Sequence, residues 1–522
     1  MEKDFSEAVG EKLGESGSAD ILEGFPVFFY VVKNPLNEVE QKIFDFLVFF
    51  SANGRKAGPL FEPVKEFLPS DFLQQFSEKA AEGFSLSLNA SRLLSDEQFV
   101  ELKQSIAFLF KSFVEKVRDP VLFGELILDR LFGFGVLGYL LRDQNLEEIM
   151  VNGPSKNVFV FHGEFGMCKT NLFVSFEELN ALSQKIAVTT SKVFNEKNPF
   201  LDGRLPRGDR VNVCFSSITP QGITLTIRKF TPMPLSIVNL LANNTVSSEA
   251  AAFLWAMVEG LNISPANVII TGGAGSGKTT TLNVLTSFIN KQDRIITIED
   301  PIELNIGKRE NWVQMETWLS AGAEKKFLMD DLLRNSFRMR PDRLIVGEVR
   351  GSEAQTLFVA MDIGHQGSMG TLHANSARET LLRLSKPPMD VPEVMIPLLD
   401  LIVVQFRMYV KGKGMIRRIT QIAEVSSMDG KPLIANIFEW DRKEDKLKRT
   451  DIPSHLIEEF SSKIISSKKE VLREITVRKK ILEWLFAKNI ADMPRVDEII
   501  QRYYFDPQSV LELVLKDSRV TS

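Results

Sequence analysis

The feature that most constrains the fold of this chain is a glycine-rich stretch, residues 272–279, placed directly behind the apolar run 268–270. Its sequence, Gly-Gly-Ala-Gly-Ser-Gly-Lys-Thr, fits the pattern G-x-x-x-x-G-K-[ST], which joins a buried strand to a helix in phosphate-binding loops. We therefore expect a strand, a loop and a helix in that order. A glycine-rich turn without a ligand is the alternative, and the strand and helix cues on either side speak against it.

Each residue type in this loop has a chemical role in binding a nucleoside triphosphate. Glycines let backbone N–H groups close around phosphate oxygens, and the positive end of the following helix adds to the attraction. Lys278 is placed to reach the β and γ phosphates, and the hydroxyl group of Thr279 is a suitable ligand for Mg²⁺. The predicted cofactors are ATP and Mg²⁺, and the predicted nucleotide-binding residues are Gly272, Gly273, Ala274, Gly275, Ser276, Gly277, Lys278, Thr279 and Thr280.

Composition limits the classes of protein that can carry this loop. The chain has 522 residues, 44% hydrophobic and 25% charged, which fits an ordinary globular protein of about three or four domains. Its apolar runs stop well short of the roughly 18 residues that a membrane-spanning helix needs. Cys168 and Cys214 are the two cysteines, too few for a disulfide framework and in keeping with a reducing cytoplasm. The net charge of −5 disfavours nucleic acid as a partner.

The part of the chain before the loop divides into two regions and a linker. Residues 1–118 are predicted to form a helical N-terminal region, because apolar residues recur there at helical spacing. Residues 119–230 are predicted to form an α+β domain, since short alternating runs typical of strands are separated by glycine turns. Residues 231–247, with Pro232 and Pro234, are interpreted as a linker at which the flanking units can hinge.

Around and after the loop the pattern is that of an α/β protein. In residues 248–450 short apolar strands alternate with helices, and from residue 401 onward three strands follow one another with short polar breaks. The fold class predicted is α/β, a RecA-like P-loop ATPase core with an antiparallel β extension, preceded by the α+β domain and the helical region. Residues 451–522 are predicted to be helical and charged.

Hydrolysis needs groups that hold Mg²⁺ and orient a water molecule. Glu348 ends an apolar strand at 344–348, the position from which a buried strand delivers a carboxylate to the phosphates, so we assign it the metal and water role. A second acidic cluster at 299–303 follows another strand, and there Glu303 is the first candidate for activating water and Glu299 the second. Helix capping or a surface turn is the alternative explanation of either cluster.

Four sequence blocks, taken together, resemble the ATPases of type II and type IV secretion systems, the motors that assemble pili, drive type II secretion and power the archaellum. The blocks are the phosphate loop at 272–279, an aspartate box at 296–303, a Walker B block at 340–351 and a histidine box at 364–375. Residues 374–379 resemble the tight-adherence pilus branch, whereas 31–35 and 387–392 are similar to the archaeal secretion and archaellum branch. The zinc-binding tetracysteine module of many bacterial members is missing, so no zinc is expected.

The resemblance implies a hexameric ring that binds ATP between its N-terminal and C-terminal units. Arg204, Arg210 and Arg228 would then reach the phosphates, as guanidinium groups match phosphate oxygens in pairs. Surface arginines with no ligand are the alternative. His365 and His373 would couple the state of the γ phosphate to the neighbouring strand, and a satisfied core histidine is the alternative for His373.

The function expected is ATP-driven closure of the two units, which moves a membrane-embedded platform protein and assembles or secretes pilin-like subunits. The resemblance implies a cytoplasmic homo-hexamer at the membrane periphery that works with the pilin-like filament machinery. Two alternatives remain open. One is a nucleic-acid-remodelling ATPase, which the acidic composition disfavours; the other is a non-hydrolysing nucleotide-binding scaffold, which Glu303 and Glu348 disfavour.

Overall fold

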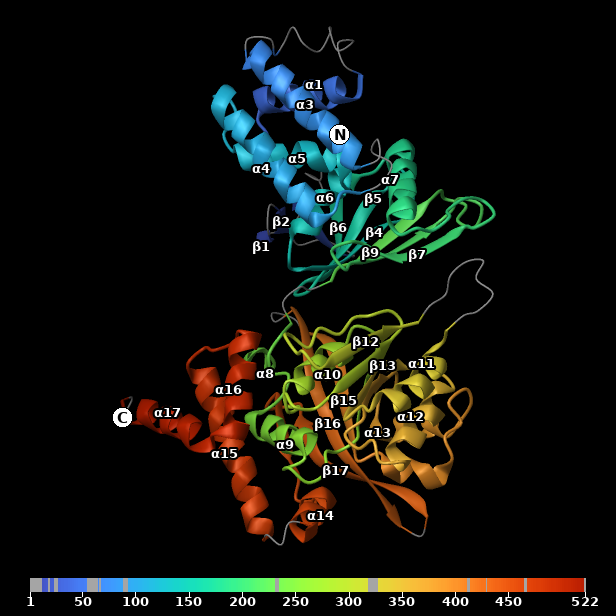
Figure 1. The fold of residues 1–522 in the computed structure, drawn as a ribbon, viewed down its shortest axis with the longest axis vertical. Coiled ribbons are helices and arrows are strands. Elements are labelled where there is room, and N and C mark those ends of the chain that lie inside the picture. Colours follow the sequence, from blue (N-terminus) through green and yellow to red (C-terminus); the bar gives the residue numbers. More distant parts are fainter. Residues whose placement is uncertain are drawn as a thin grey trace. The chain divides into compact units, whose positions relative to one another are not determined.

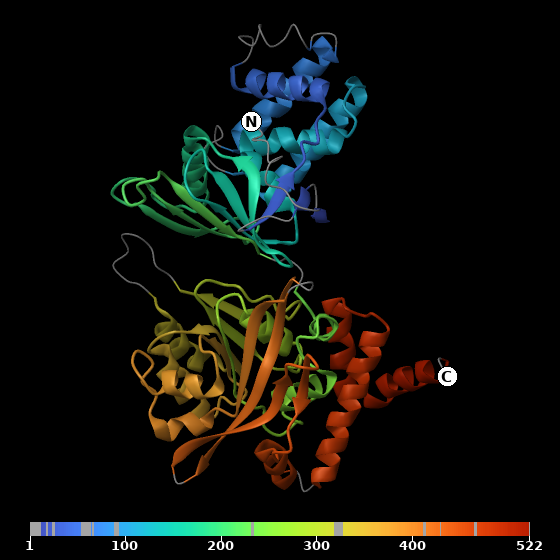
Figure 2. The ribbon, with the colours of Figure 1, turned by 180° about the vertical axis from the view of Figure 1, so that it is seen from behind.

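A computed structural model of the chain describes residues 12–16, 19–22, 27–53, 64, 67–87, 93–230, 234–317, 327–410, 414–428, 430–463 and 467–520. Contacts divide the chain into two compact units, Met1–Thr231 and Pro232–Ser522, and each unit is described by itself. Figures 1 and 2 show the ribbon from two sides.

Within the described part of unit 1, nine strands form one sheet in the order β1-β2-β3-β6-β5-β4-β9-β8-β7. Neighbours are antiparallel except β3 and β6, which are parallel. The strands are β1 (Lys12–Ser16), β2 (Ala19–Leu22), β3 (Phe28–Val32), β4 (Leu146–Val151), β5 (Asn157–His162), β6 (Gly166–Phe173), β7 (Phe200–Arg204), β8 (Arg210–Cys214) and β9 (Thr224–Arg228). One face of the sheet packs on helix α7 (Phe176–Thr189), through Leu179, Leu182 and Ile186.

A helical bundle lies in the chain between β3 and β4 of this sheet. Its helices are α1 (Glu38–Asn53), α3 (Ser70–Leu86), α4 (Asp96–Phe113) and α5 (Pro120–Phe132), followed by the short η3 (Gly135–Leu137) and α6 (Gly138–Arg142). Ser95 and Asp119 cap the first turns of α4 and α5 with their side chains, which fixes where these helices begin. Buried phenylalanines fill the bundle, with the rings of Phe110 and Phe123 4.8 Å apart.

The prediction of a helical region at 1–118 is wrong for β1, β2 and β3, which are strands. The sequence of β3, Phe-Phe-Tyr-Val-Val, is aromatic and β-branched, and such residues favour a strand. Its backbone is satisfied by β2 on one side and by β6 on the other. The N-terminal strands therefore extend the sheet of the α+β domain.

Unit 2 contains the predicted α/β core and its antiparallel extension, which confirms the fold class. In the described residues the strand order is β12-β11-β13-β14-β10-β15-β16-β17-β18, parallel as far as β15 and antiparallel beyond it. The strands are β10 (Val268–Gly272), β11 (Ile295–Glu299), β12 (Trp312–Glu316), β13 (Arg343–Val349), β14 (Met369–Leu372), β15 (Leu401–Val410), β16 (Gly414–Met428), β17 (Lys431–Asp441) and β18 (Lys446–Arg449).

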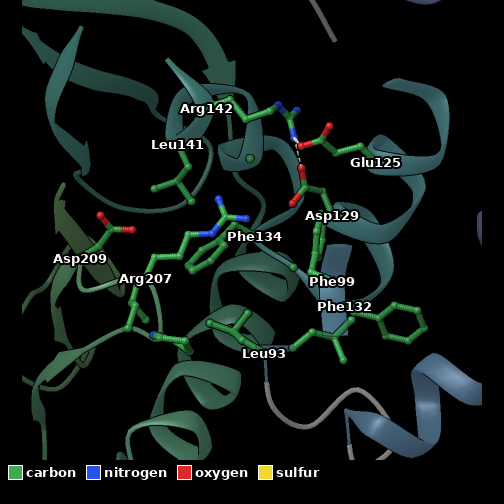
Figure 3. A pocket seen from close by; sticks show the side chains of 15 residues that line it. Leu93, Phe99, Glu125, Asp129, Phe132, Phe134, Leu141, Arg142, Arg207 and Asp209 are labelled. Carbon is green, nitrogen blue, oxygen red and sulfur yellow. Dashed lines mark hydrogen bonds and ion pairs between the residues drawn. The ribbon is translucent and has the colours of Figure 1, made fainter. Parts of the chain in front are cut away.

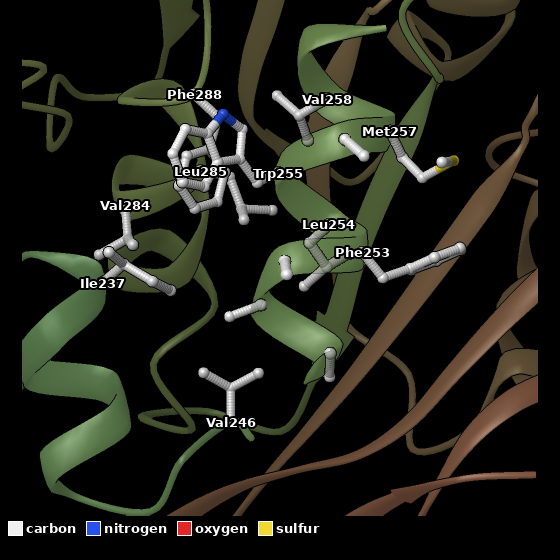
Figure 4. Close-up of a cluster of buried hydrophobic side chains, with 14 of the residues drawn as sticks. Ile237, Val246, Phe253, Leu254, Trp255, Met257, Val258, Val284, Leu285 and Phe288 are labelled. Carbon is white, nitrogen blue, oxygen red and sulfur yellow. The ribbon is translucent and has the colours of Figure 1, made fainter. Parts of the chain in front are cut away.

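Both faces of this sheet are covered, as expected for short, mostly apolar parallel strands. Val268 and Ile270 of β10 belong to the core that α9 and α10 cover, whereas Ile269 belongs to the core beneath α12 and α13. Figure 4 shows the first core, where the rings of Trp255 and Phe288 stack 5.4 Å apart. The helices are α8 (Ile237–Ala242), α9 (Ser248–Glu259), α10 (Lys278–Thr286), α11 (Met329–Ser336), η4 (Phe337–Met339), α12 (Glu353–Asp362), α13 (Ala377–Leu384) and η5 (Glu393–Leu398).

The predicted linker at 231–247 is only partly a linker, because α8 lies within it and buries Ile237, Val238 and Leu240 in the core of unit 2. The predicted hinge at residues 232–234 lies mostly outside the described residues. The chain is described again from Pro234. An apolar helix of this kind belongs to the packed unit that follows it.

The C-terminal region is helical, as predicted, and it packs on α9. Its helices are α14 (His455–Lys463), α15 (Lys468–Ala487), α16 (Met493–Phe505) and α17 (Pro507–Val520). Gln501 of α16 donates to the main-chain oxygens of Ser287 and Ile289, just past the end of α10. None of the helices that the structure describes has the length and apolarity to cross a lipid bilayer.

Candidate nucleotide-binding site

The predicted phosphate loop, residues 272–279, lies between the buried strand β10 and the first turn of α10. Gly275 and Gly277 have φ angles of +67° and +95°, a region of backbone space that other residues rarely adopt. Gly277 is also the N-cap residue of α10, so the positive end of that helix faces the loop. The loop thus has the backbone geometry that an anion site at a helix N-terminus needs.

Two donors of the loop converge on one oxygen atom. The Nζ atom of Lys278 donates to the carbonyl oxygen of Gly273 at 3.0 Å, and the backbone N–H of Ser276 donates to the same oxygen at 3.3 Å. A phosphate oxygen is a stronger acceptor for these donors, because it carries charge. The loop therefore presents a cationic and a neutral donor at one point.

Neighbouring strands hold the two ends of the loop. Thr271, at the end of β10, donates its hydroxyl proton to the carbonyl oxygen of Ala374 at 3.0 Å, which ties the loop to the histidine box. Thr281, in the first turns of α10, donates to Oε1 of Gln405 at 2.7 Å. Both contacts are buried, so the strand, the loop and the helix are fixed in one arrangement.

Glu348 and His373 meet at the ends of β13 and β14. The Nε2 atom of His373 is 2.8 Å from Oε1 of Glu348, and Nη2 of Arg350 donates to Oε2 of Glu348 at 2.5 Å. The sequence predicted both Glu348 and His373, and the structure places them in direct contact. Arg350, which lies in the same Walker B block, adds a second positive group to the carboxylate.

The charges in this cluster favour an ionised carboxylate beside a neutral imidazole. Burial by itself would raise the pKa of Glu348, but the hydrogen bond and charge of Arg350, together with His373 and Lys278, lower it below its usual value. Burial and the charge of Lys278 lower the pKa of His373. Lys278 contributes to both shifts, which indicates that the phosphate loop lies near the Glu348 cluster.

Glu299 is buried, and its side chain holds a turn. Its Oε2 atom accepts the backbone N–H groups of Glu303 and Leu304 at 2.7 and 2.8 Å. Gly347 allows this approach, because a Cβ atom there would lie 2.9 Å from Cγ of Glu299. Glu299 therefore shapes the acidic turn, and the half-buried Glu303 is the better placed of the two to face a ligand.

The buried state of Glu299 predicts a pH dependence of stability. Burial raises the pKa of this carboxyl group to about 7 from 4.5, with the two backbone hydrogen bonds opposing the shift. The folded state thus holds the proton more tightly than the unfolded state. Its stabilising contribution is complete below pH 4.5 and is lost as the pH rises towards 7. Glu299→Gln keeps an acceptor for both N–H groups and cannot ionise. Between pH 4.5 and 7 the free energy of unfolding of this variant should therefore fall less than that of the wild type.

Urea unfolding of the wild type and Glu299→Gln between these two pH values is the measurement. Glu310→Gln, which removes an exposed carboxyl group, is the matched control for the change in net charge. If Glu299→Gln lost stability with pH as steeply as the wild type, the buried carboxyl group would not be the cause.

His365 lies apart from this cluster. It follows the end of α12, where its ring stacks on Phe337 with centroids 5.6 Å apart and its backbone N–H donates to Ala360. Its described contacts include neither Glu348 nor His373. The structure therefore supports a packing role for His365 and brings only His373 of the two predicted histidines to the carboxylate.

The three predicted arginines lie in unit 1, and the structure aligns them. Arg204 of β7 pairs in register with Arg210 of β8, which in turn pairs with Arg228 of β9. Residues that pair in this way place their side chains on the same face, so the three guanidinium groups form an arginine row across three strands. Their next partner in the register is Glu148 of β4.

The turn that joins β7 and β8 is braced from inside the unit. Asp209 accepts the backbone N–H of Phe230 at 2.7 Å, and Arg207 extends over the ring of Phe99 at 5.9 Å. Figure 3 shows Arg207 pointing into a pocket that also contains Asp129 and Arg142, which form an ion pair. The helical bundle therefore supports the turn that carries Arg204 and Arg210.

The groups predicted to hold Mg²⁺ are the hydroxyl of Thr279 and the carboxylate of Glu348. Both are oxygen ligands of the kind that Mg²⁺ prefers, and this ion is usually held by one or two protein groups together with substrate phosphates. Among the residues that the structure describes, no group of three or more His, Cys, Asp or Glu side chains forms a metal cage. The hydroxyl group of Thr279 and the carboxylate of Glu348 fit an ion of this kind as oxygen donors.

The sequence patterns did not indicate three residues that lie against the loop. Gln405 and Arg407 of β15, and Arg417 of β16, approach it from the antiparallel extension. No motif contains them. Only the register of β15 with β16, in which Arg407 pairs with Arg417, could have indicated the arrangement.

The parallel core, the glycine loop between β10 and α10, and the carboxylate on β13 define a protein of the P-loop class. The chain belongs to the family described as type II/IV secretion system protein, whose sequence model matches residues 133–450. This confirms the family resemblance predicted from the four sequence blocks.

Several known proteins are similar to this chain. The uncharacterized protein MJ0900 of Methanocaldococcus jannaschii is 31% identical over 96% of this chain and 92% of its own length. Protein VirB11 of Rhizobium radiobacter is 30% identical over 45% of this chain and 74% of its own. Among solved structures, the VirB11 ATPase of Brucella suis is 24% identical, covers 54% of this chain and 90% of its own, and has a TM-score of 0.28. The pilus retraction motor PilT is 19% identical, with coverages of 64% and 89% and a TM-score of 0.39.

Proposed function

We propose that this protein is an ATP-hydrolysing motor that works as a hexamer on a membrane platform protein and powers the assembly or secretion of pilin-like filaments. Its family membership supports the secretion role. The observation that carries the enzymatic part is geometric: Lys278 begins the helix that follows the glycine loop, and Glu348, at the end of the core strand β13, lies in contact with His373 and Arg350. We place the protein in the cytoplasm, at the membrane.

In this proposal each residue of the site has a separate task. The loop N–H groups and Lys278 bind the β and γ phosphates. Thr279 and Glu348 would hold Mg²⁺, which when bound neutralises charge on the phosphates. Arg350 donates to Oε2 of Glu348 and so orients the carboxylate, and His373 lies beside Oε1. Glu303, on the turn that Glu299 shapes, orients the attacking water.

We also propose that the arginine row binds phosphate oxygens. The register places the three arginines on one face of the sheet, with Glu148 beside Arg228, and guanidinium groups are suitable donors to phosphate oxygens. Arg210, in the middle of the row, should matter most. Arg210→Ala is expected to lower kcat by about a thousandfold, the lower end of the range known for arginines that stabilise phosphoryl transfer, with little change in nucleotide affinity.

Steady-state ATP turnover and direct ATP titration of Arg210→Ala and of Arg207→Ala would measure this. Arg207 is the matched control, because it belongs to the same turn but points into the pocket of Figure 3. Unchanged turnover of Arg210→Ala would remove the row from catalysis.

The test of the proposed function is ATP turnover by the wild type, measured with the mass of the assembly in the presence of ATP and Mg²⁺. Turnover by a six-subunit assembly, stimulated by membranes that contain the platform protein, is the expected result. Turnover stimulated by DNA, and lost at high salt, would instead favour a nucleic-acid-remodelling ATPase. Assembly with ATP but without turnover would favour a nucleotide-binding scaffold.

A further inference from the structure

The antiparallel extension of unit 2 forms a wall beside the phosphate loop. Gln405 of β15 lies closest: a Cβ atom built on Gly272 would be 2.1 Å from its main-chain oxygen, and one built on Gly277 would be 3.0 Å from its Nε2 atom. Its Oε1 atom accepts the hydroxyl proton of Thr281. β15 therefore touches the loop at its beginning and at its end.

Two arginines of the same wall meet the middle of the loop. Arg407 and Arg417 pair in register across β15 and β16. Nε of Arg417 donates to the carbonyl oxygen of Gly275 at 3.1 Å, and a Cβ atom on Gly275 would lie 2.5 Å from Nη1 of Arg407. Two positive groups thus lie against one residue of the loop.

The contact of Arg417 constrains the direction of one peptide group. In a planar trans peptide the C=O and N–H bonds point in opposite directions. When Arg417 holds the Gly275 carbonyl on the side of the wall, the N–H of the next residue, Ser276, points away from the wall. That N–H donates to the Gly273 oxygen, which Lys278 also contacts.

We infer that Arg417 is a positioning residue for the phosphate loop: it holds the Gly275–Ser276 peptide so that the Ser276 N–H and Lys278 converge on a phosphate oxygen. This inference rests on the proposed function, in which the loop binds a nucleoside triphosphate. The important atom is Nε, a hydrogen-bond donor at a fixed distance along the side chain. The positive charge of Arg417 is secondary.

Three substitutions separate the hydrogen bond from the charge. Arg417→Gln puts an amide nitrogen at the position of Nε and removes the charge, Arg417→Met keeps the length and removes both, and Arg417→Lys keeps the charge and moves the donor one atom further. Arg418→Met is the matched control, because Arg418 is the next residue of β16 and binds Asp445 away from the loop. Thermal unfolding reports whether each variant folds.

Calorimetric titration with ADP and with a non-hydrolysable ATP analogue, both with Mg²⁺, is the measurement. Arg417→Met should bind both nucleotides about tenfold more weakly, the upper end of the loss expected for one hydrogen bond, while Arg417→Gln and Arg418→Met stay within about threefold of the wild type. Rescue by Lys but not by Gln, or an equal loss in Arg418→Met, would overturn the positioning role.

A Lys278→Ala variant shows whether a negative result contradicts the role of Arg417 or the proposed function itself. If Lys278→Ala fails to bind while Arg417→Met binds as the wild type does, the loop is a nucleotide site and the inference about Arg417 is wrong. If the wild type and Lys278→Ala bind equally, the loop does not bind the nucleotide, and the proposed function falls together with the role of Arg417.

Discussion

Glu348→Gln is expected to bind ATP and to stop turning it over. The substitution keeps the shape and the polar contacts of the side chain, so the cluster with His373 and Arg350 should stay in place. It removes the negative charge that the surrounding positive groups stabilise. A carboxylate that holds a metal or orients water contributes about a hundredfold to ten-thousandfold to the rate, so we expect kcat to fall by at least about a hundredfold.

Single-turnover ATP hydrolysis and calorimetric ATP titration, with the mass of the assembly measured alongside, would test this expectation. Glu353→Gln is not a suitable control, because Glu353 accepts backbone N–H groups of residues 350 and 351. Glu310→Gln is suitable, since that carboxyl group is exposed. Equal turnover by the wild type and Glu348→Gln would show that hydrolysis does not need the Glu348 carboxylate, and the assignment of Glu348 would then be wrong.

Local sequence patterns predicted the parts of the site that depend on neighbouring residues. The strand before the loop, the glycines, and the carboxylate at the end of β13 all lie within a few residues of the pattern that indicates them. Strand–loop–helix order and apolar burial follow from those residues alone. The strand predicted at 344–348 therefore matches β13 to within one residue at each end.

Sequence patterns did not predict the contacts that depend on the pairing register of strands far apart in the sequence. Arg417 reaches Gly275 across 142 positions of sequence, through the pairing of β10 with β15 and of β15 with β16. β3 was missed for a similar reason, since its parallel partner is β6. The arginine row is an intermediate case. Its three members were predicted, but their alignment depends on the register of β7, β8 and β9.

Unit 2 has a cluster of buried charged and aromatic side chains at the junction of α9 with the C-terminal helices. Arg478 of α15 is at its centre. The guanidinium group is 4% exposed and pairs with Glu259, which is 3% exposed, at 2.8 Å. It also lies over the ring of Trp255 at 5.3 Å. Glu259 in turn accepts the backbone N–H of Leu261 just past the end of α9, so both partners serve the packing of these helices.

Arg478→Met is expected to destabilise the protein by about 3–5 kcal/mol, because it leaves the carboxylate of Glu259 buried without its partner. The double variant Arg478→Met/Glu259→Gln should recover part of this loss, since neither charge then remains. Urea unfolding followed by tryptophan fluorescence would measure both, and the exposed Arg473→Met on the same helix is the control. A loss in Arg478→Met no larger than that in Arg473→Met would contradict the argument.

Contacts at the same junction connect the packing around Arg478 to the nucleotide site. Gln501 and Tyr504 of α16 bind main-chain oxygens in residues 287–289, directly after α10, and Trp255 donates to the hydroxyl oxygen of Tyr504. Because α10 begins at Lys278, loosening these contacts frees the far end of the helix that carries the lysine. Arg478→Met should therefore weaken ATP binding at temperatures well below its unfolding transition. In the double variant, ATP affinity and stability should both be partly restored. If the ion pair acted only locally, both variants would bind ATP as tightly as the wild type does, whatever their stability.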